Sequence, residues 1–94
     1  MRRLLTTVFD PSQPYALDPS VAIRPEPFGG LAYHYGNRRL TFLRDPLLVE
    51  LVRDLERHPS VDAALAASPI APTRWPSFRQ ALSSLNESEV VRAR

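Results

Sequence analysis

The sequence of 94 residues contains no cysteine. It therefore has no disulfide framework, no thiolate nucleophile and no cysteine ligands for zinc or an iron–sulfur cluster. Lysine is absent as well, so all 12 basic side chains are arginines, and the formal net charge is only +2. Because affinity for phosphates grows with the number of charges that a protein neutralises, this small net charge argues against a nucleic-acid partner.

Long hydrophobic runs are also missing. No stretch approaches the ~20 apolar residues that a membrane-spanning helix needs, so we expect no membrane partner. Residues 1–9 begin like a signal peptide, but the apolar run stops at Asp10-Pro11 and no small-residue cleavage site follows. Together with the lack of cysteine, this pattern favours a cytoplasmic location.

Catalytic and metal-binding patterns are equally scarce. The only histidines are His34 and His58, and no spacing of His, Asp and Glu matches a metal site. Gly29-Gly30 precedes a β-favouring run, whereas a phosphate-binding loop leads into a helix. No serine or threonine stands in a nucleophile elbow. We therefore expect no enzyme activity, no catalytic residue, no metal site and no cofactor.

What the sequence does contain is a meander of strands. Three β-favouring runs, at 21–24, 31–35 and 39–43, are separated by turn-forming clusters at 25–30 and 36–38. Alternation predicts one apolar face, made of Val21, Ile23, Leu31, Tyr33, Tyr35, Leu40 and Phe42. It predicts an opposite, polar face made of Ala22, Arg24, His34, Arg39 and Thr41. A three-stranded sheet of this kind needs a cover over its apolar face.

The second half of the chain supplies that cover as three predicted helices. Apolar residues recur there at helical spacing, and each run follows a residue that can cap a helix. Pro46 and Pro76 fall in first turns, where the missing N–H costs nothing. The helices are expected at 46–58, 61–67 and 73–85, with N-caps Asp45, Ser60 and Thr73.

Three strands followed by three helices predict an α+β fold, a winged-helix-like domain with a three-stranded antiparallel sheet followed by three helices. At this length the chain forms one small domain. We expect it over residues 17–94, after a flexible N-terminal arm at 1–16. Residues 90–91 have two open interpretations, a brief terminal strand or a frayed tail.

The last strand of the meander, at 39–43, leaves one side of the sheet unpaired. Its sequence lacks the proline, bulge or inward charge that normally blunts an edge. The third helix is the richest of the helices in large aromatic residues, with Trp75 and Phe78, and it comes near that edge in this topology. A peptide can add itself as a strand to an edge beside an apolar helix. An edge covered by the protein's own tail is an equal alternative.

A winged helix that binds DNA is the rival hypothesis. Its third helix would enter the major groove and would carry several basic or amide side chains. Between 73 and 85 those side chains are Arg74, Arg79 and Gln80, beside three serines. This is a thin set for a recognition helix, so we expect no nucleic acid among the partners.

Three segments carry a resemblance to a known family. They are 17–24 (LDPSVAIR), 27–35 (PFGGLAYHY) and 39–43 (RLTFL). In order and spacing they resemble the peptide chaperones of mycofactocin biosynthesis. They are similar, more distantly, to the PqqD-like family of pyrroloquinoline quinone biosynthesis, whose domain type is the RiPP recognition element. The resemblance extends over residues 17–85, although the helices agree only in pattern.

The resemblance implies a non-enzymatic adaptor with the winged-helix-like fold of a RiPP recognition element. Such a domain binds the leader of a ribosomally made precursor peptide by β-strand addition. It presents the core, which ends in Val-Tyr in the mycofactocin system, to a radical SAM maturase. The implied partners are the precursor leader and that maturase, and a homodimer stays open. The implied peptide-binding residues are Arg39, Leu40, Thr41, Phe42 and Leu43 on the strand and Phe78, Arg79, Leu82 and Ser83 on the helix.

Overall fold

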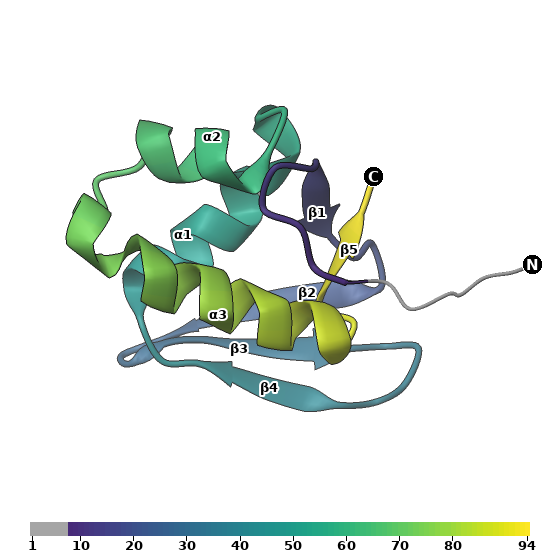
Figure 1. The fold of residues 1–94 in the computed structure, drawn as a ribbon. Coiled ribbons are helices and arrows are strands. Elements are labelled where there is room, and N and C mark those ends of the chain that lie inside the picture. Colours follow the sequence, from purple (N-terminus) through teal and green to yellow (C-terminus); the bar gives the residue numbers. More distant parts are fainter. Residues whose placement is uncertain (1–7) are drawn as a thin grey trace, which may run out of the picture.

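The computed structural model describes residues 8–94, so the first part of the expected arm, residues 1–7, lies outside it. The chain is an α+β domain in which a three-stranded antiparallel sheet precedes three helices, as predicted (Figure 1). Short 3-10 turns at Leu55–Arg57 and Pro72–Arg74 flank the helices. The strands and α-helices are β1 (Tyr15–Leu17), β2 (Val21–Glu26), β3 (Gly29–His34), β4 (Leu40–Leu43), α1 (Pro46–Asp54), α2 (Val61–Ala67), α3 (Trp75–Glu87) and β5 (Val91–Ala93).

The predicted meander is the β2-β3-β4 sheet, with strands paired in that order. Its first two strands extend into the expected turn at 25–30, and Pro25 pairs opposite Gly30. The proline is tolerated because it occupies an outer edge, at a position that donates no bond to β3. The turn therefore shrinks to residues 27–28, followed by Gly29 with φ +144°, a backbone conformation that favours glycine.

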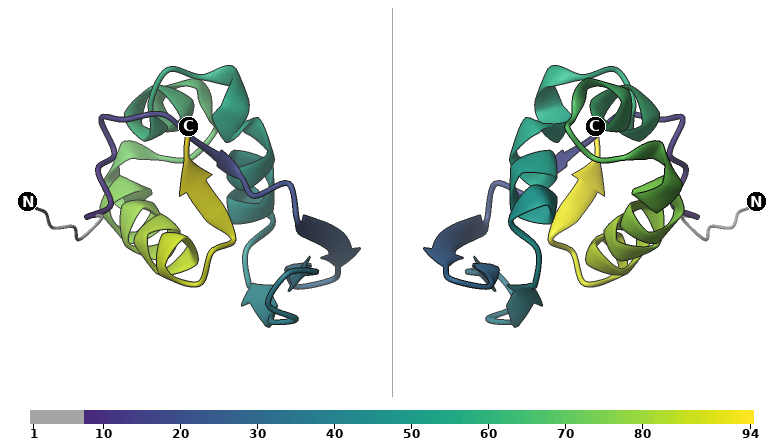
Figure 2. Two further views of the ribbon diagram at one scale, coloured as in Figure 1. Left: turned by 90° about the vertical axis from the view of Figure 1, so that its right-hand side faces the viewer. Right: turned by 90° about the vertical axis from the view of Figure 1, so that its left-hand side faces the viewer.

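The face of this sheet that packs on the helices is not the one predicted for β3 and β4. Tyr35, Leu40 and Phe42 point away from the core and are 66%, 58% and 53% exposed. The buried face instead carries small residues, because α1 approaches the sheet closely. A Cβ on Gly30 would lie 2.9 Å from Cγ2 of Val49 on α1. All helices in residues 8–94 lie on this one side of the sheet (Figure 2).

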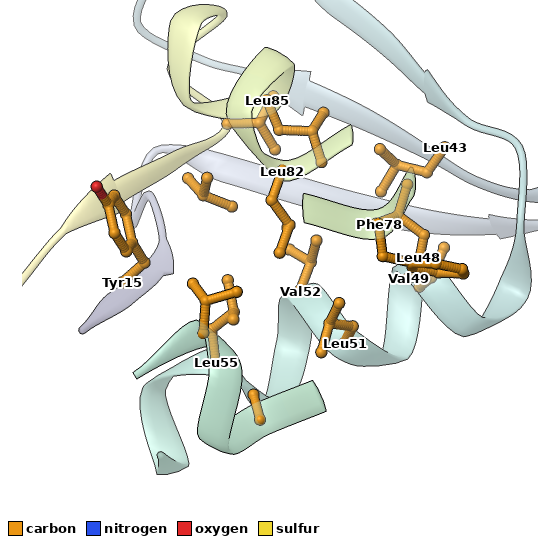
Figure 3. Packing of buried hydrophobic residues seen from close by; sticks show 14 of the residues in the cluster. Tyr15, Leu43, Leu48, Val49, Leu51, Val52, Leu55, Phe78, Leu82 and Leu85 are labelled. Atoms are coloured by element: carbon orange, nitrogen blue, oxygen red, sulfur yellow. The ribbon is translucent and has the colours of Figure 1, made fainter. Parts of the chain in front are cut away.

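The hydrophobic core fills the space between that inner face and the helices. Leu43, the last residue of β4, is fully buried and lies beside Leu48, Val49 and Phe78 (Figure 3). Further along, Leu82 of α3 packs toward Val52 of α1. The inner face, α1 and α3 thus form a single core.

The first two helices begin as predicted. The Asp45 carboxylate accepts the Leu47 N–H at 2.9 Å, and the Ser60 hydroxyl oxygen accepts the Ala63 N–H at 3.0 Å. Each bond satisfies one N–H that a helix start leaves unpaired. Helix α1 is shorter than expected, because after Asp54 the chain continues as a 3-10 turn rather than an α-helix.

The predicted cap of the third helix is wrong. Thr73 lies inside the 3-10 turn Pro72–Arg74, and α3 begins at Trp75 without a side-chain cap. The indole N–H of Trp75 donates to the Ile70 carbonyl at 2.9 Å, and this bond links the first residue of the helix to the segment before the 3-10 turn.

The two ends of the described chain meet in a second, two-stranded sheet. β1 pairs antiparallel with β5, so that Tyr15 lies opposite Ala93 (Figure 2). The Tyr15 side chain is buried in the core and packs against Phe9 with ring centroids 4.7 Å apart. Residues 8–16 of the expected arm therefore pack on the domain. Of the two interpretations of the C-terminal segment, the terminal strand is confirmed.

Candidate functional site

The open side of β4 is the first feature of the candidate site. In an antiparallel pair, successive residues alternately bond to the neighbouring strand and turn their backbone groups away. The His34 N–H donates to the Arg39 carbonyl at 3.0 Å, which sets this alternation. Thr41 therefore bonds toward β3. Leu40 and Phe42 turn their N–H and C=O groups to the open side, where residues 8–94 provide no partner.

The opposite edge of the sheet, on β2, is blunted. By the same alternation, its outward positions are Val21, Ile23 and Pro25. The Val21 N–H is donated to the Asp18 carbonyl at 2.9 Å, and the Ile23 carbonyl accepts from Arg53 at 3.2 Å. Proline has no N–H to offer. The chain's tail does not cover β4 either, because β5 pairs with β1.

A small cleft lies where β4 leads into α1. Its volume is about 160 Å³, and its lining residues are Asp45, Leu48, Arg74, Ser77, Phe78 and Ala81. Arg74 lies 3.0 Å from the Asp45 carboxylate, and its guanidinium lies over the Phe78 ring, 5.0 Å from the centroid. The cleft thus combines an apolar wall with one cation, and it adjoins the open edge through Asp45, two residues beyond the end of β4.

The predicted helix residues are divided between two faces of α3. Phe78 lines the cleft, whereas Leu82 is fully buried in the core. Arg79 pairs with Asp62 of α2 at 2.9 Å, so its side chain is directed away from the cleft. Ser83 stands one turn further along that same face.

Sequence reasoning missed the cleft residues Arg74, Ser77 and Ala81. Together with Phe78 they occupy positions 74, 77, 78 and 81, which is the i, i+3, i+4, i+7 spacing of one helix face. Helical periodicity applied to Phe78 would have found them.

Exposed arginines flank the open edge, on which Leu40 and Phe42 present their backbone groups. Arg39 precedes β4, and neither it nor Arg38 nor Arg44 is paired with an acidic side chain in the described residues. Arg44 instead lies over the Phe42 ring, 5.2 Å from the centroid. The open edge is therefore bordered by positive charge.

His34 has a structural role, although on the buried face rather than the predicted polar one. Its Nδ1 accepts the N–H groups of Gly36 and Asn37 at 3.0 and 3.2 Å, which fixes the turn between β3 and β4. Its Nε2 lies 3.9 Å from the Asp18 carboxylate. The ring is thus committed to the protein's own groups on both sides.

Residues 8–94 contain no group of three or more His, Asp or Glu side chains placed to hold a metal ion. No helix there has the length and apolar character to cross a membrane.

An α+β domain with one open strand edge beside a small apolar cleft defines a class of compact binding domain. Within that class, the chain belongs to the peptide chaperone MftB family, whose sequence profile matches residues 14–92.

Curated relatives carry the same name, peptide chaperone MftB, and this chain matches most of their length. The peptide chaperone MftB of Mycolicibacterium smegmatis is 41% identical over 83 residues, which cover 88% of this chain and 81% of that protein. The peptide chaperone MftB of Mycobacterium ulcerans is 40% identical over 83 residues, 88% of this chain and 76% of that protein. That of Mycobacterium tuberculosis is 36% identical over 90 residues, 96% of this chain and 83% of that protein. No solved structure matches the chain significantly.

Proposed function

We propose that this chain is a non-enzymatic chaperone that captures the leader of a ribosomally made precursor peptide and presents the peptide to a radical SAM maturase. The observation that carries the proposal is the open edge of β4, where Leu40 and Phe42 turn unpaired backbone groups outward. Membership of the peptide chaperone MftB family supports it. The leader would pair with β4 as a fourth strand of the sheet.

The surroundings of the edge indicate which leaders would bind. Side chains of an added strand alternate between the two faces of the sheet. Those on the inner side would enter the cleft between the start of α1 and α3, against Phe78 and Ala81. Arg38, Arg39 and Arg44 would attract acidic residues of the leader. The buried Leu82 and the paired Arg79 would act indirectly, by holding α3 in place.

The affinity expected from this mode is moderate. Each backbone hydrogen bond contributes about 1 kcal/mol net, and the leader loses its disorder on binding. We therefore expect a Kd of about 0.1–10 μM, or roughly −7 to −9.5 kcal/mol.

Phe42→Pro tests the strand addition, with Phe42→Ala as its matched control. Both variants lose the aromatic ring, but only proline removes the N–H that faces the open side. We expect Phe42→Pro to bind a synthetic leader about tenfold more weakly than Phe42→Ala, which corresponds to about 1.4 kcal/mol. The probe is a synthetic leader from a precursor peptide of the mycofactocin type, and its binding is measured by calorimetry. Thr41→Pro is unsuitable because its N–H faces β3.

Two readouts decide the experiment. Far-ultraviolet circular dichroism should match between the two variants, because proline is tolerated at an edge position of a strand. Amide NMR shifts on adding leader should cluster at residues 40–44 and 74–81. Equal affinity of the two variants, or shifts centred on α2, would contradict the proposal.

Little in the structure favours the rival function, DNA binding. The arginines at the start and middle of α3 are both paired, Arg74 with Asp45 and Arg79 with Asp62. A recognition helix needs such side chains free to reach bases and phosphates.

A further inference from the structure

The outer face of the β2-β3-β4 sheet, turned away from the helices, is not covered by any part of residues 8–94 (Figures 1 and 2). A shallow hollow of about 600 Å³ lies on it, lined by Ala22, Ile23, Arg24, Pro25, Leu31, Tyr33, Tyr35 and Leu40. Phe28 and Phe42 are also exposed. A contiguous apolar surface of this kind on a folded domain marks an interaction site.

The aromatic side chains of the outer face hold one another in place. Phe28 stacks on Phe42 with centroids 5.6 Å apart, and Tyr33 meets Tyr35 edge to face at 4.8 Å. Rings that are ordered before binding lose little conformational entropy when a partner arrives. Aromatic anchors at the centre of an open surface are typical of protein–protein contacts, whereas a small-molecule site encloses most of its ligand.

The border of the outer face is positively charged. Arg24 stands on it opposite Leu31 in the ladder, and Arg44 lies over the Phe42 ring. Arg24 is paired with Glu26 at 2.7 Å, whereas Arg44 has no acidic partner within residues 8–94. The complementary surface is therefore an apolar patch with an acidic border.

We propose that the outer face is the docking surface for the enzyme that receives the peptide. This inference rests on the proposed function, because the outer face is continuous with the open edge. Leu40 and Phe42 carry their side chains on the outer face and their unpaired backbone groups on the edge. A strand added to β4 extends the sheet, so every second side chain of the leader would lie on the outer face, on the same side of the sheet as Phe42. An enzyme on this face contacts chaperone and peptide together.

A second copy of this chain is the competing occupant. A dimer formed through the outer face would cover Leu40 and Phe42 on both copies and would bury the outward side chains of each bound leader. The positive borders of two identical faces would also come together, which costs free energy through like-charge contact. Both arguments favour an acidic enzyme surface over self-association.

The test separates docking from leader binding by using residues that lie outside β4 and contribute no backbone group to its open edge. Tyr35→Ser removes a ring of the outer face, and Arg24→Glu reverses a charge on β2, the far edge of the sheet. Arg57→Glu is the matched charge control, because its side chain is 75% exposed and lies on the 3-10 turn after α1. The probe is a purified radical SAM maturase of the mycofactocin type, and its binding is measured by biolayer interferometry with and without saturating leader.

We expect Tyr35→Ser and Arg24→Glu to weaken enzyme binding at least tenfold, while Arg57→Glu leaves it within twofold. All three variants should bind leader like the wild type. Unchanged enzyme affinity in both test variants would overturn the inference while leaving the proposed function intact. A wild-type chain that binds no leader would instead overturn the proposed function. A wild-type dimer that becomes a monomer in Tyr35→Ser, with enzyme affinity unchanged, would assign the face to a second copy.

Discussion

Leu43 and Leu40, three residues apart on β4, allow a direct test of which face of the sheet is buried. Leu43 is 0% exposed and lies among side chains of α1 and α3, whereas Leu40 is 58% exposed on the outer face. Leu43→Ala removes three carbon groups from the core, worth about 2.5 kcal/mol in transfer free energy. The cavity left behind raises the loss to about 3–4 kcal/mol. Leu40→Ala loses only the buried share, about 1 kcal/mol, and leaves no cavity.

Urea unfolding followed by circular dichroism measures the difference. With a slope of about 1–1.5 kcal/mol/M, Leu43→Ala should lower the unfolding midpoint by about 2–4 M and Leu40→Ala by about 1 M or less. The slopes of the two variants should match, since both expose the same surface on unfolding. Equal midpoints, or a larger loss for Leu40→Ala, would show that the outer face is the buried one and would refute the arrangement of layers described above.

Further predictions concern single interactions. Asp45→Ala should lower the free energy of unfolding by about 0.5–2 kcal/mol in thermal melts, because the Leu47 N–H loses its cap. Hydrogen bonds from Ser12 hold the pKa of Asp10 below its ordinary value, so Ser12→Ala should raise that pKa in a carboxyl NMR titration. The depressed pKa of Asp10 contributes stability above its unfolded-state pKa, and this contribution is lost as the pH falls through the folded-state value. Untagged protein should carry neither metal in elemental analysis nor flavin absorbance, and His34→Ala should change neither result.

Local features of the fold could be predicted well from the sequence. The meander, the caps Asp45 and Ser60 and the open edge at 39–43 all depend on residues close together in the chain. Turn formers and capping side chains act over a few positions, so their effects are visible in the sequence itself. The two-stranded sheet was only one of two alternatives for the C-terminal segment, because its partner strands stand at opposite ends of the sequence.

The buried face of the sheet could not be predicted, because the inner face of β3 carries only Gly30, Ala32 and His34, a weaker apolar signal than that of the outer face. Tyr33 and Tyr35 are larger than Ala32, yet it is Ala32 that faces the helices. The choice depends on how closely α1 approaches Gly30, which is a property of the packed domain. A stronger apolar signal on the exposed side is what a binding surface produces.

The candidate site was predicted more accurately on the strand than on the helix. The edge at β4 needs only the order of the strands, which the turns define. The cleft residues of α3 share one helix face with Phe78, so periodicity can group them. Which face of α3 meets the start of α1 is a property of the packed domain, and the sequence does not define it.

The pairing of β1 with β5 has a consequence for the order in which the domain assembles. It joins segments from the two ends of the described chain, so the loop that must close is almost as long as the domain itself. Closing a long loop costs conformational entropy before any contact is gained, and such contacts tend to form late. The sheet, α1 and α3 should therefore assemble first, and the pairing of β1 with β5 should then fix the far end of α3. Among the strand amides that are hydrogen-bonded within the domain, exchange in the native protein should be fastest at residues 15–17 and 91–93.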